Sequence, residues 1–188
     1  MSVISLSLST DHVFSKTLSS SLNLLPDLGV EGDCHCGKTV QHRSRLHIRP
    51  PPKNLRQVHL IDLEILEQFD VKPGDLGENV TTRGLRLLER PTGTKLHFLP
   101  QATTTVEDTT IAETSHPVVV LTGLRNPCPQ IQKFRSGLQE KFIVRDEERK
   151  IVERKAGVMS TVEVGGVIEV GMRVLVEEPD EFQQLQSV

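Results

Sequence analysis

The chain has 188 residues, a length typical of one domain with its own hydrophobic core, and a formal net charge of -3 with 25% charged residues. This balance creates no long-range field that would attract nucleic acid, and the absence of Trp and Tyr removes the platforms on which bases stack. An odd number of cysteines and no recognisable leader favour a reducing compartment, so we expect a cytoplasmic protein. No apolar run approaches the length of a membrane span, so we expect a soluble protein without a membrane partner. A small-molecule substrate or cofactor is the expected partner.

The first half of the chain combines β-prone runs with one long irregular loop. Residues 3–9, VISLSLS, alternate apolar residues with serine, which is the pattern of a half-buried strand. Residues 28–54 are dense in Gly, His, Cys, Arg and Pro without periodicity, and loops of this length are usually functional or disordered. A second strand is predicted at 56–61, with Asp62 as the N-cap of a short helix over 63–69.

The second half of the chain is richer in strands. Residues 116–124, HPVVVLTGL, form a strand with a continuous apolar middle, and 128–134 can open a short helix after it. Beyond these, the sequence predicts a run of hairpins, with a polar turn at 146–149 and a Gly-Gly turn at 165–166.

Short strands at close spacing with few helices indicate a barrel or sandwich, because a parallel sheet needs longer helical crossovers. We favour the barrel. The prediction is a mainly β, mostly antiparallel barrel with a few short helices, forming one domain over residues 1–180 and followed by a polar C-terminal tail over 181–188.

Cys128 is the first candidate for chemistry. Pro127 and Pro129 flank it, and because proline fixes φ and lacks an N–H, the backbone on both sides of the thiol is stiffened. The nearby Arg125 and the positive end of a helix starting after the cysteine would both favour the thiolate. A thiolate is a strong nucleophile and a soft metal ligand, so we predict that Cys128 is catalytic or ligates a metal, the alternative being a small buried apolar residue.

The loop segment GDCHCGKTVQHRSRLH supplies a second group of candidates. His35 and His42 are candidates for moving protons, because imidazole titrates near neutral pH. Several cations in the same segment form a surface that can receive an anion. These cations are Lys38, Arg43 and Arg45.

Cys34 and Cys36 in this loop do not have the spacing of a zinc finger, which usually uses C-x₂₋₄-C and a second ligand pair. In an extended segment the two thiols would point to one face and His35 to the other, so that His35 can face a pocket while the cysteines pack. We expect both cysteines to fill space.

Polar residues near the predicted strand at 56–61 complete the list. Arg56 and His59 would lie on opposite faces by alternation, so only one of them is expected to line a pocket. Glu78 and Asn79 follow in the segment LGENVTTRG, and Asn126 precedes Cys128. The alternative for Arg56 is a solvated surface charge, and for Glu78 and Asn79 a role in a turn.

Five segments, in this order, resemble a MOSC domain, which is named after the C-terminal domain of molybdenum-cofactor sulfurase. They are GVEGDCHCGKTVQHRSR, NLRQVHLID, GENVTTRGLRLLERPTGTKLHF, VVVLTGLRNPCPQIQKF and AGVMSTVEVGGVIEVGMRV. The resemblance covers nearly the full chain and implies a β-barrel similar to the barrel domain of pyruvate kinase. Cys34 and Cys36 depart from the pattern, since small residues are usual there in relatives.

The resemblance implies a function for Cys128, which stands in the family's Arg-x-Pro-Cys context. In relatives this cysteine is proposed to ligate the molybdenum of a pterin cofactor, as in enzymes that reduce N-hydroxylated compounds, or to carry sulfur as a persulfide. The family is also associated with pyridoxal phosphate binding. The resemblance thus implies a molybdenum-cofactor-dependent oxidoreductase or a sulfur transferase. The candidate cofactor-binding residues are Arg125, Asn126, Lys38, Arg43, Arg45, Arg56 and Asn79.

Three functions therefore stay open. In the leading hypothesis, Cys128 binds the metal of a molybdenum cofactor. In the second, the chain needs no metal and receives sulfur on Cys128 from a cysteine desulfurase. In the third, a metal-free lyase or isomerase of a biosynthetic pathway uses His35, His42 and Glu78 as acid and base.

Overall fold

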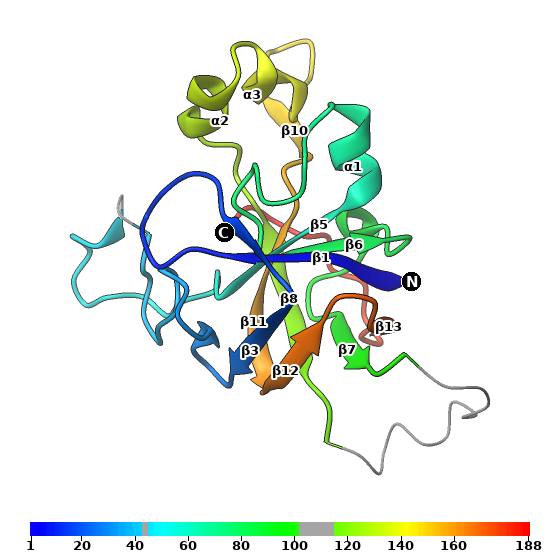
Figure 1. Cartoon of the computed structure of the whole chain (residues 1–188). Helices are drawn as coiled ribbons and strands as arrows, with labels where there is room; N and C mark the ends of the chain where they lie inside the picture. The colour runs from blue at the N-terminus through cyan, green and yellow to red at the C-terminus, as the bar shows by residue number, and fades with distance from the viewer. Residues whose placement is uncertain (43–44, 102–114) are drawn as a thin grey trace.

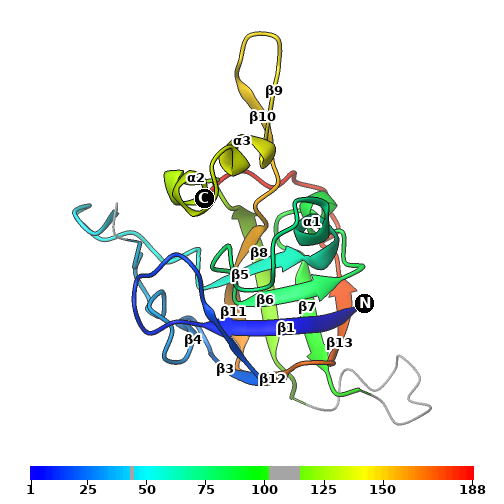
Figure 2. The same ribbon diagram turned by 45° about the horizontal axis from the view of Figure 1, so that its top comes forward.

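A barrel forms the centre of the computed structural model, which describes residues 1–42, 45–101 and 115–188. Within these residues seven strands close into a ring, shown in Figures 1 and 2. In ring order the strands are β13 (Arg173–Glu177), β7 (Lys95–Leu99), β8 (Val118–Leu124), β11 (Val158–Val164), β5 (Val58–Asp62), β6 (Val80–Arg83) and β1 (Ser2–Leu8), which pairs with β13 again. The predicted mainly β barrel with a few short helices is confirmed.

Neighbouring strands of the ring run antiparallel, as predicted, with one difference. Strands β5 and β6 are parallel, with Leu60 opposite Val80, so the barrel is mixed. The segment that joins them contains α1 (Leu63–Gln68) and returns the chain to the same end of the sheet. A parallel pair needs such a crossover, and this one is short because its helix has only 6 residues.

Two hydrophobic cores lie on either side of β5, because successive side chains of a strand point to opposite faces. Val58 and Leu60 pack into the barrel interior with Phe98. Ile61 belongs instead to a second core, between the barrel and the helices, together with Phe142 and other apolar residues. Strand β5 is therefore buried along its whole length, and it fixes the layer of helices against the barrel.

The smaller elements attach to this frame. Strand β2 (Thr17–Ser19) pairs antiparallel with the end of β1, and a small sheet contains β3 (Ser21–Leu25), β4 (Gly29–Val30) and β12 (Gly166–Glu169). In the described residues the helices are α1, α2 (Pro129–Phe134), α3 (Leu138–Lys141) and the 3-10 turn η2 (Leu87–Glu89). Figure 2 shows the hairpin of β9 (Ile143–Arg145) and β10 (Ile151–Arg154) projecting from the body beside α3.

One predicted hairpin is wrong. The polar turn at 146–149 does join two paired strands, but the chain changes partner at the Gly-Gly step. A Cβ atom on Gly165 would lie 2.7 Å from the carbonyl oxygen of Leu24, so only glycine lets the chain pass this close to β3. Strand β12 then pairs with β3 instead of folding back on β11.

Asp62 occupies the N-cap position predicted for α1, but its side chain bonds to residues outside the helix. Asp62 holds the N-cap position without a side-chain capping bond. Its carboxylate accepts hydrogen bonds from the Leu87 N–H at 2.7 Å and the Thr82 hydroxyl at 2.9 Å. The residue therefore ties the 3-10 turn and β6 to the end of β5.

The segment 181–188, predicted as a polar tail, is tied to the barrel. Leu185 is only 3% exposed and belongs to the barrel core. Gln184 forms a bridge with Pro91, and Ser187 forms one with Leu124. Composition did not predict this contact, because it depends on the side chain of Leu185 and on bridges to residues that are distant in the sequence.

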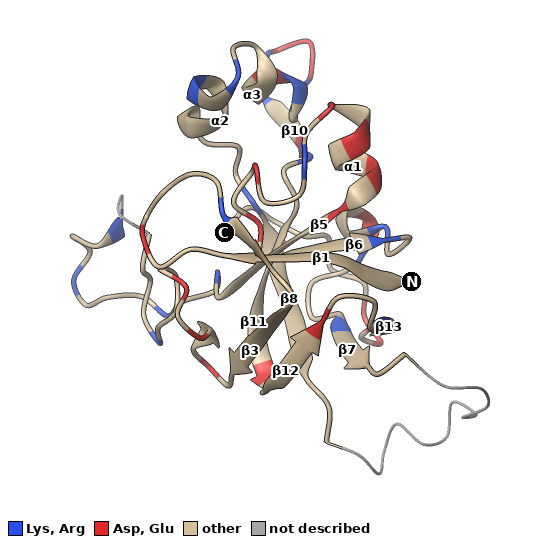
Figure 3. Ribbon diagram, viewed as in Figure 1, with Lys and Arg blue, Asp and Glu red and all other residues tan. Residues whose placement is uncertain are grey.

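Charges are mixed over the fold, as Figure 3 shows for Lys and Arg against Asp and Glu. This distribution agrees with the small net charge of -3. In the part of the chain that the structure describes, no helix is long and apolar enough to cross a membrane.

Candidate functional site

A pocket with two chambers lies where the loop after β1, the long loop after β4 and the segment before α2 meet. The inner chamber has a volume of about 70 Å³ and the outer chamber about 320 Å³. The two share the lining residues Val13, His35, His42, Cys128 and Gln130, so they form one site. The thiol of Cys128 therefore lies on the wall common to both chambers.

The inner chamber brings together residues that are far apart in the sequence. Cys128 and its neighbours come from the end of β8, and two histidines come from the long loop. The predicted site residues found in its lining are Cys128, Arg125, Asn126, His35, His42, Arg56 and Asn79.

Arg56 and His59 both line the inner chamber, against the expectation that only one of them would. The expectation assumed a strand over 56–61, whereas β5 begins at Val58 and Arg56 lies in the preceding loop. Strand alternation therefore does not apply between the two side chains.

Other predicted residues lie outside the chambers. The side chains of Lys38 and Arg45 are exposed and line neither chamber, and Arg43 lies outside the described residues. Glu78 is fully buried below the pocket, where its Oε1 accepts hydrogen bonds from the Gly74 N–H and the Thr81 hydroxyl. Burial raises the pKa of this carboxyl. Glu78 therefore lines neither chamber.

Sequence reasoning missed the contribution of the loop after β1. Val13, Phe14 and Lys16 line the inner chamber, although nothing in their local pattern marks them. Gly77, in the turn before β6, explains how the loop fits, because its φ of +77° and a Cβ distance of 2.4 Å to the Phe14 carbonyl allow no side chain there. Only the close approach of two distant segments creates this wall.

Asp33 is the hub that holds the loops together. Its Oδ2 pairs with Lys16 Nζ at 2.6 Å and accepts hydrogen bonds from the Asn79 side chain at 3.0 Å and the Ser9 N–H at 3.3 Å. Its Oδ1 accepts the backbone N–H of His35 at 3.0 Å. Burial alone would raise the pKa of Asp33, but hydrogen bonds from His35 and the charge of Lys16 hold it well below its usual range.

Cys34 and His35 lie on the same side of their loop, which corrects the expectation of opposite faces. The hydrogen bond from the His35 N–H to Asp33 turns the chain, so the segment is not extended. Cys34 Sγ lies 3.1 Å from His35 Nδ1. Burial, together with the charge of Asp33, raises the pKa of Cys34 to about 11.

Asn79 and Asn126 line the chamber with amides that are already engaged. The Asn79 side chain donates to Asp33 and accepts the backbone N–H of His59 at 3.1 Å. Asn126 accepts a hydrogen bond from Arg154 Nε at 3.1 Å. Both amides thus position the chamber walls.

Cys128 and Arg125 form the reactive end of the inner chamber. Cys128 is half-buried at the N-cap of α2, with Pro129 as the first helical residue. The guanidinium of Arg125 lies over the Phe14 ring at 5.9 Å, and its Nη1 has no hydrogen-bond partner among the described residues. Burial lowers the pKa of Arg125, while interactions with Cys128 and Glu78 oppose this shift.

The inner chamber is positive, because Arg56 and Arg125 line it and none of its described lining residues carries a carboxylate. Lys16 also lines it, but Asp33 offsets its charge, and burial lowers its pKa. Burial and the neighbouring arginine charges lower the pKa of Arg56 to about 10, which leaves it charged at neutral pH. His59 donates from Nε2 to the Ala156 carbonyl at 2.8 Å, and burial keeps its pKa well below the ordinary value. The chamber is therefore suited to an anion.

Comparison with known proteins identifies the fold. No family model matches the sequence, and a search of curated proteins finds no match. Among solved structures, the YUAD protein (YuaD) from Bacillus subtilis is 19% identical, with a TM-score of 0.66 over 95% of this chain and 96% of that one. YuaD and YiiM are MOSC-domain proteins. The chain has the MOSC-domain fold.

Two further structures support this conclusion. YiiM from Geobacillus stearothermophilus is 15% identical, with a TM-score of 0.57 over 94% of this chain and 75% of that one. YiiM from Escherichia coli is 16% identical, with a TM-score of 0.52 over 98% of this chain and 74% of that one. The MOSC fold predicted from the five sequence segments is confirmed.

His42 of this MOSC barrel offers a direct test of the pocket's charge. Burial and the charges of Arg56 and other cations lower its pKa to about 4, so the ring is neutral at pH 7. We expect its Hε1 resonance to titrate near pH 4 in an NMR experiment, and Arg56→Gln to raise the midpoint by removing the positive charge that lowers this pKa most. A wild-type midpoint at the ordinary value of about 6.5 would contradict a positive pocket.

Proposed function

We propose that the chain is a small molybdenum-cofactor-dependent enzyme that reduces N-hydroxylated or related small molecules, with Cys128 as a ligand of the metal. The observation that carries this proposal is the Arg125 guanidinium, only 8% exposed, whose Nη1 lacks a partner beside the chamber that Cys128 lines. A buried donor left unpaired costs about 1–3 kcal/mol, so a bound anion that pairs with it gains that energy.

The residues present fit such a cofactor. A cysteine sulfur is a soft ligand suited to molybdenum, and fixed cations bind a phosphate. The inner chamber, at about 70 Å³, is too small for a pterin, whereas the outer chamber, at about 320 Å³, falls within the roughly 300–1,000 Å³ typical of ligand sites. In this proposal Arg125, Arg56 and Lys16 hold anionic groups at the inner chamber.

The chain's own residues bind, orient and move protons. Bound there, the cofactor would supply the two electrons that break an N–O bond, with two protons consumed and water released. The ion pair with Asp33 fixes Lys16 in the chamber wall. His35 lies 3.3 Å from Asp33 Oδ1, and a carboxylate that orients an imidazole makes it suitable for carrying a proton. His42, neutral above about pH 4, would accept hydrogen bonds from the substrate.

Metal analysis tests the proposal. The chain is purified from cells supplied with molybdate, and its metal content and its activity on an amidoxime, with dithionite-reduced methyl viologen as electron donor, are measured together. We expect molybdenum in a ratio close to one per chain, and activity that follows the metal content across preparations. Full activity in preparations without molybdenum or tungsten would overturn the proposal.

A sulfur carrier is the second candidate, favoured by the position of Cys128 on the wall of the outer chamber. In this case a cysteine desulfurase would transfer the outer sulfur of its persulfide to Cys128, and the donor thiolate would leave. Incubation with desulfurase and cysteine should then add one sulfur atom to the wild-type mass and none to Cys128→Ser. An unchanged wild-type mass would count against it.

The metal-free lyase or isomerase receives less support from the site. Its proposed third group, Glu78, lies below the pocket and lines neither chamber. His35 and His42 stay as candidate acid and base for this alternative.

A further inference from the structure

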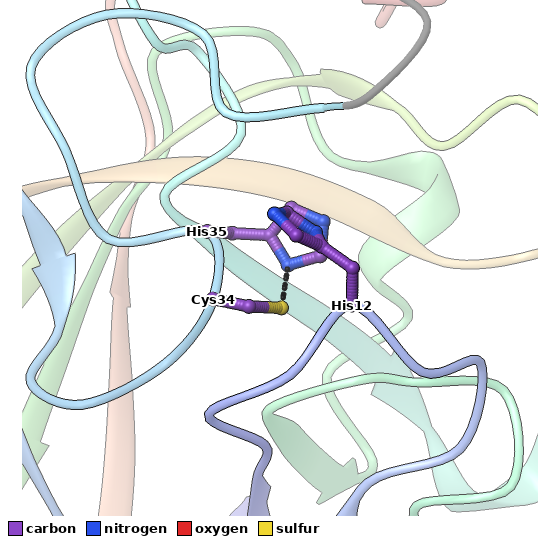
Figure 4. A group of neighbouring side chains, drawn as sticks. All are labelled: His12, Cys34 and His35. Atoms are coloured by element: carbon purple, nitrogen blue, oxygen red, sulfur yellow. Dashed lines mark hydrogen bonds between the residues drawn. The ribbon is translucent and has the colours of Figure 1, made fainter.

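A second cluster of metal-binding side chains lies beside the pocket, in residues that the proposed function does not use as metal ligands. His12 comes from the loop after β1, and Cys34 and His35 come from the loop after β4. One ligand atom from each residue lies within 4.8 Å of the others. Figure 4 shows the three side chains turned toward one another, with Cys34 Sγ 3.1 Å from His35 Nδ1.

The spacing of these atoms is close to that of a tetrahedral metal site. Around zinc, ligand atoms at about 2.0–2.3 Å from the metal lie roughly 3.3–3.8 Å apart. The rings of His12 and His35 are nearly perpendicular, with centroids 5.4 Å apart, so they already approach a common point from different directions. A contraction of about 1 Å by side-chain rotation would complete the site.

The groups around the cluster support it. Asp33 accepts the backbone N–H of His35, and Lys16 and Asn79 hold the same carboxylate. Its Oδ1 also lies 3.3 Å from His35 Nδ1. When Nδ1 donates to this carboxylate, Nε2 is left to bind a metal, and a carboxylate that fixes a ligating imidazole through its other nitrogen is a regular feature of zinc sites. The loop is therefore held in the conformation that brings Cys34 and His35 together.

The position of the cluster gives it access to the pocket. His12 and His35 line the outer chamber, together with Cys128 and His42. Cys34 does not line the chamber. A metal held by all three residues would keep one coordination position directed into the chamber, which is the arrangement of catalytic rather than structural zinc sites.

The geometry points to a binding site for a thiophilic divalent cation, Zn²⁺, at His12, Cys34 and His35, with its open position facing the outer chamber. Two imidazoles and one thiolate are borderline-soft ligands, a set that suits zinc and disfavours calcium or magnesium. The ion would also join the loop after β1 to the loop after β4, and so fix the wall of the pocket. The site is separate from the metal position proposed at Cys128. A zinc-bound His35 would no longer carry a proton, which would leave that role to His42.

Zinc titration of the full chain tests this inference. Protein treated with a chelator and exchanged into metal-free buffer is titrated with Zn²⁺ against a zinc indicator, and with Co²⁺ while its absorption spectrum is recorded. We expect one tight site per chain and a sulfur-to-cobalt charge-transfer band. Cys34→Ser should abolish that band and weaken zinc binding by more than about 100-fold, beyond the 10–100-fold typical of changes around the ligands.

Matched variants separate this site from other thiols and from loss of folding. Cys36→Ser, in the same loop, and Cys128→Ser should both keep the band and the affinity. His12→Gln gives a second ligand change on a different loop, and should weaken zinc binding as strongly while thermal unfolding of the metal-free protein stays within a few degrees of wild type. No tight site in the wild type, or equal binding by Cys34→Ser, would overturn the inference. Molybdenum content is measured separately, so the outcome does not depend on the proposed function.

Discussion

Cys128→Ser is expected to lower kcat/KM for amidoxime reduction by more than about 100-fold, equivalent to about 2.7 kcal/mol of lost transition-state stabilisation. A serine hydroxyl is neither a soft metal ligand nor a comparable nucleophile. Because the side chain is only half-buried, the free energy of unfolding should change by less than about 1 kcal/mol. Steady-state kinetics with reduced methyl viologen and urea denaturation measure the two quantities.

Cys36→Ser is the matched control for this prediction, because Cys36 is also half-buried but lines neither chamber. It should keep nearly full activity. If Cys128→Ala stayed fully active while His42→Ala lost activity, the metal-free alternative would replace the proposed function.

Asp33→Asn is expected to lower the free energy of unfolding by about 3–5 kcal/mol, since removing one partner of a buried ion pair leaves the other charge unpaired. The side chains of Lys16 and Asp33 are 3% and 0% exposed, at a separation of 2.6 Å. Urea denaturation at pH 7 measures the change. In the double variant with Lys16→Met, part of the loss should be recovered, because the unpaired charge is gone.

An exposed ion pair provides the comparison. Glu148 and Lys150 lie 2.5 Å apart, but their side chains are 72% and 74% exposed. Glu148→Gln should therefore change stability by less than about 1 kcal/mol. A similarly small effect for Asp33→Asn would contradict the role of Asp33 as the hub of the loops.

The pH dependence of the free energy of unfolding also reports on Asp33 and His42, because the pKa of each is lowered in the folded protein. The pKa of Asp33 is lowered in the folded state, so its contribution is fully present above the unfolded value of about 3.9 and is lost as the pH falls toward the folded value. The lowered pKa of His42 acts in the same direction between about pH 6.5 and its folded value of about 4, because only the unfolded chain binds the proton there. Acid should therefore destabilise the protein in two successive ranges, first through His42 above about pH 4 and then through Asp33 below it.

The barrel could be predicted because its signals are local. The alternation in 3–9 and the apolar middle of 116–124 predict strands that the structure contains at Ser2–Leu8 and Val118–Leu124. The exchange of partners at Gly165 could not be predicted, since it depends on a carbonyl of Leu24 that is distant in the sequence. Pairing partners, unlike strands, are set by contacts between distant segments.

In the candidate site too, some residues could be predicted from the local sequence and others could not. Cys128 and Arg125 stand out in the sequence because their residue types and the flanking prolines carry the chemistry. Lys16 and His12 do not, because a lysine and a histidine in a polar loop look like solvated residues until Asp33 and the long loop are placed beside them. The sequence predicts the reactive group, but not the loop that completes its surroundings.

X-ray absorption at the molybdenum edge is the most direct test of the central claim, that the Cys128 sulfur binds the metal. The spectrum reports the number of sulfur atoms bound to molybdenum in the loaded protein. We expect Cys128→Ser, loaded to a measured molybdenum content, to show one sulfur ligand fewer than the wild type, while Cys36→Ser shows the wild-type number. The same sulfur count in wild type and Cys128→Ser would contradict the claim.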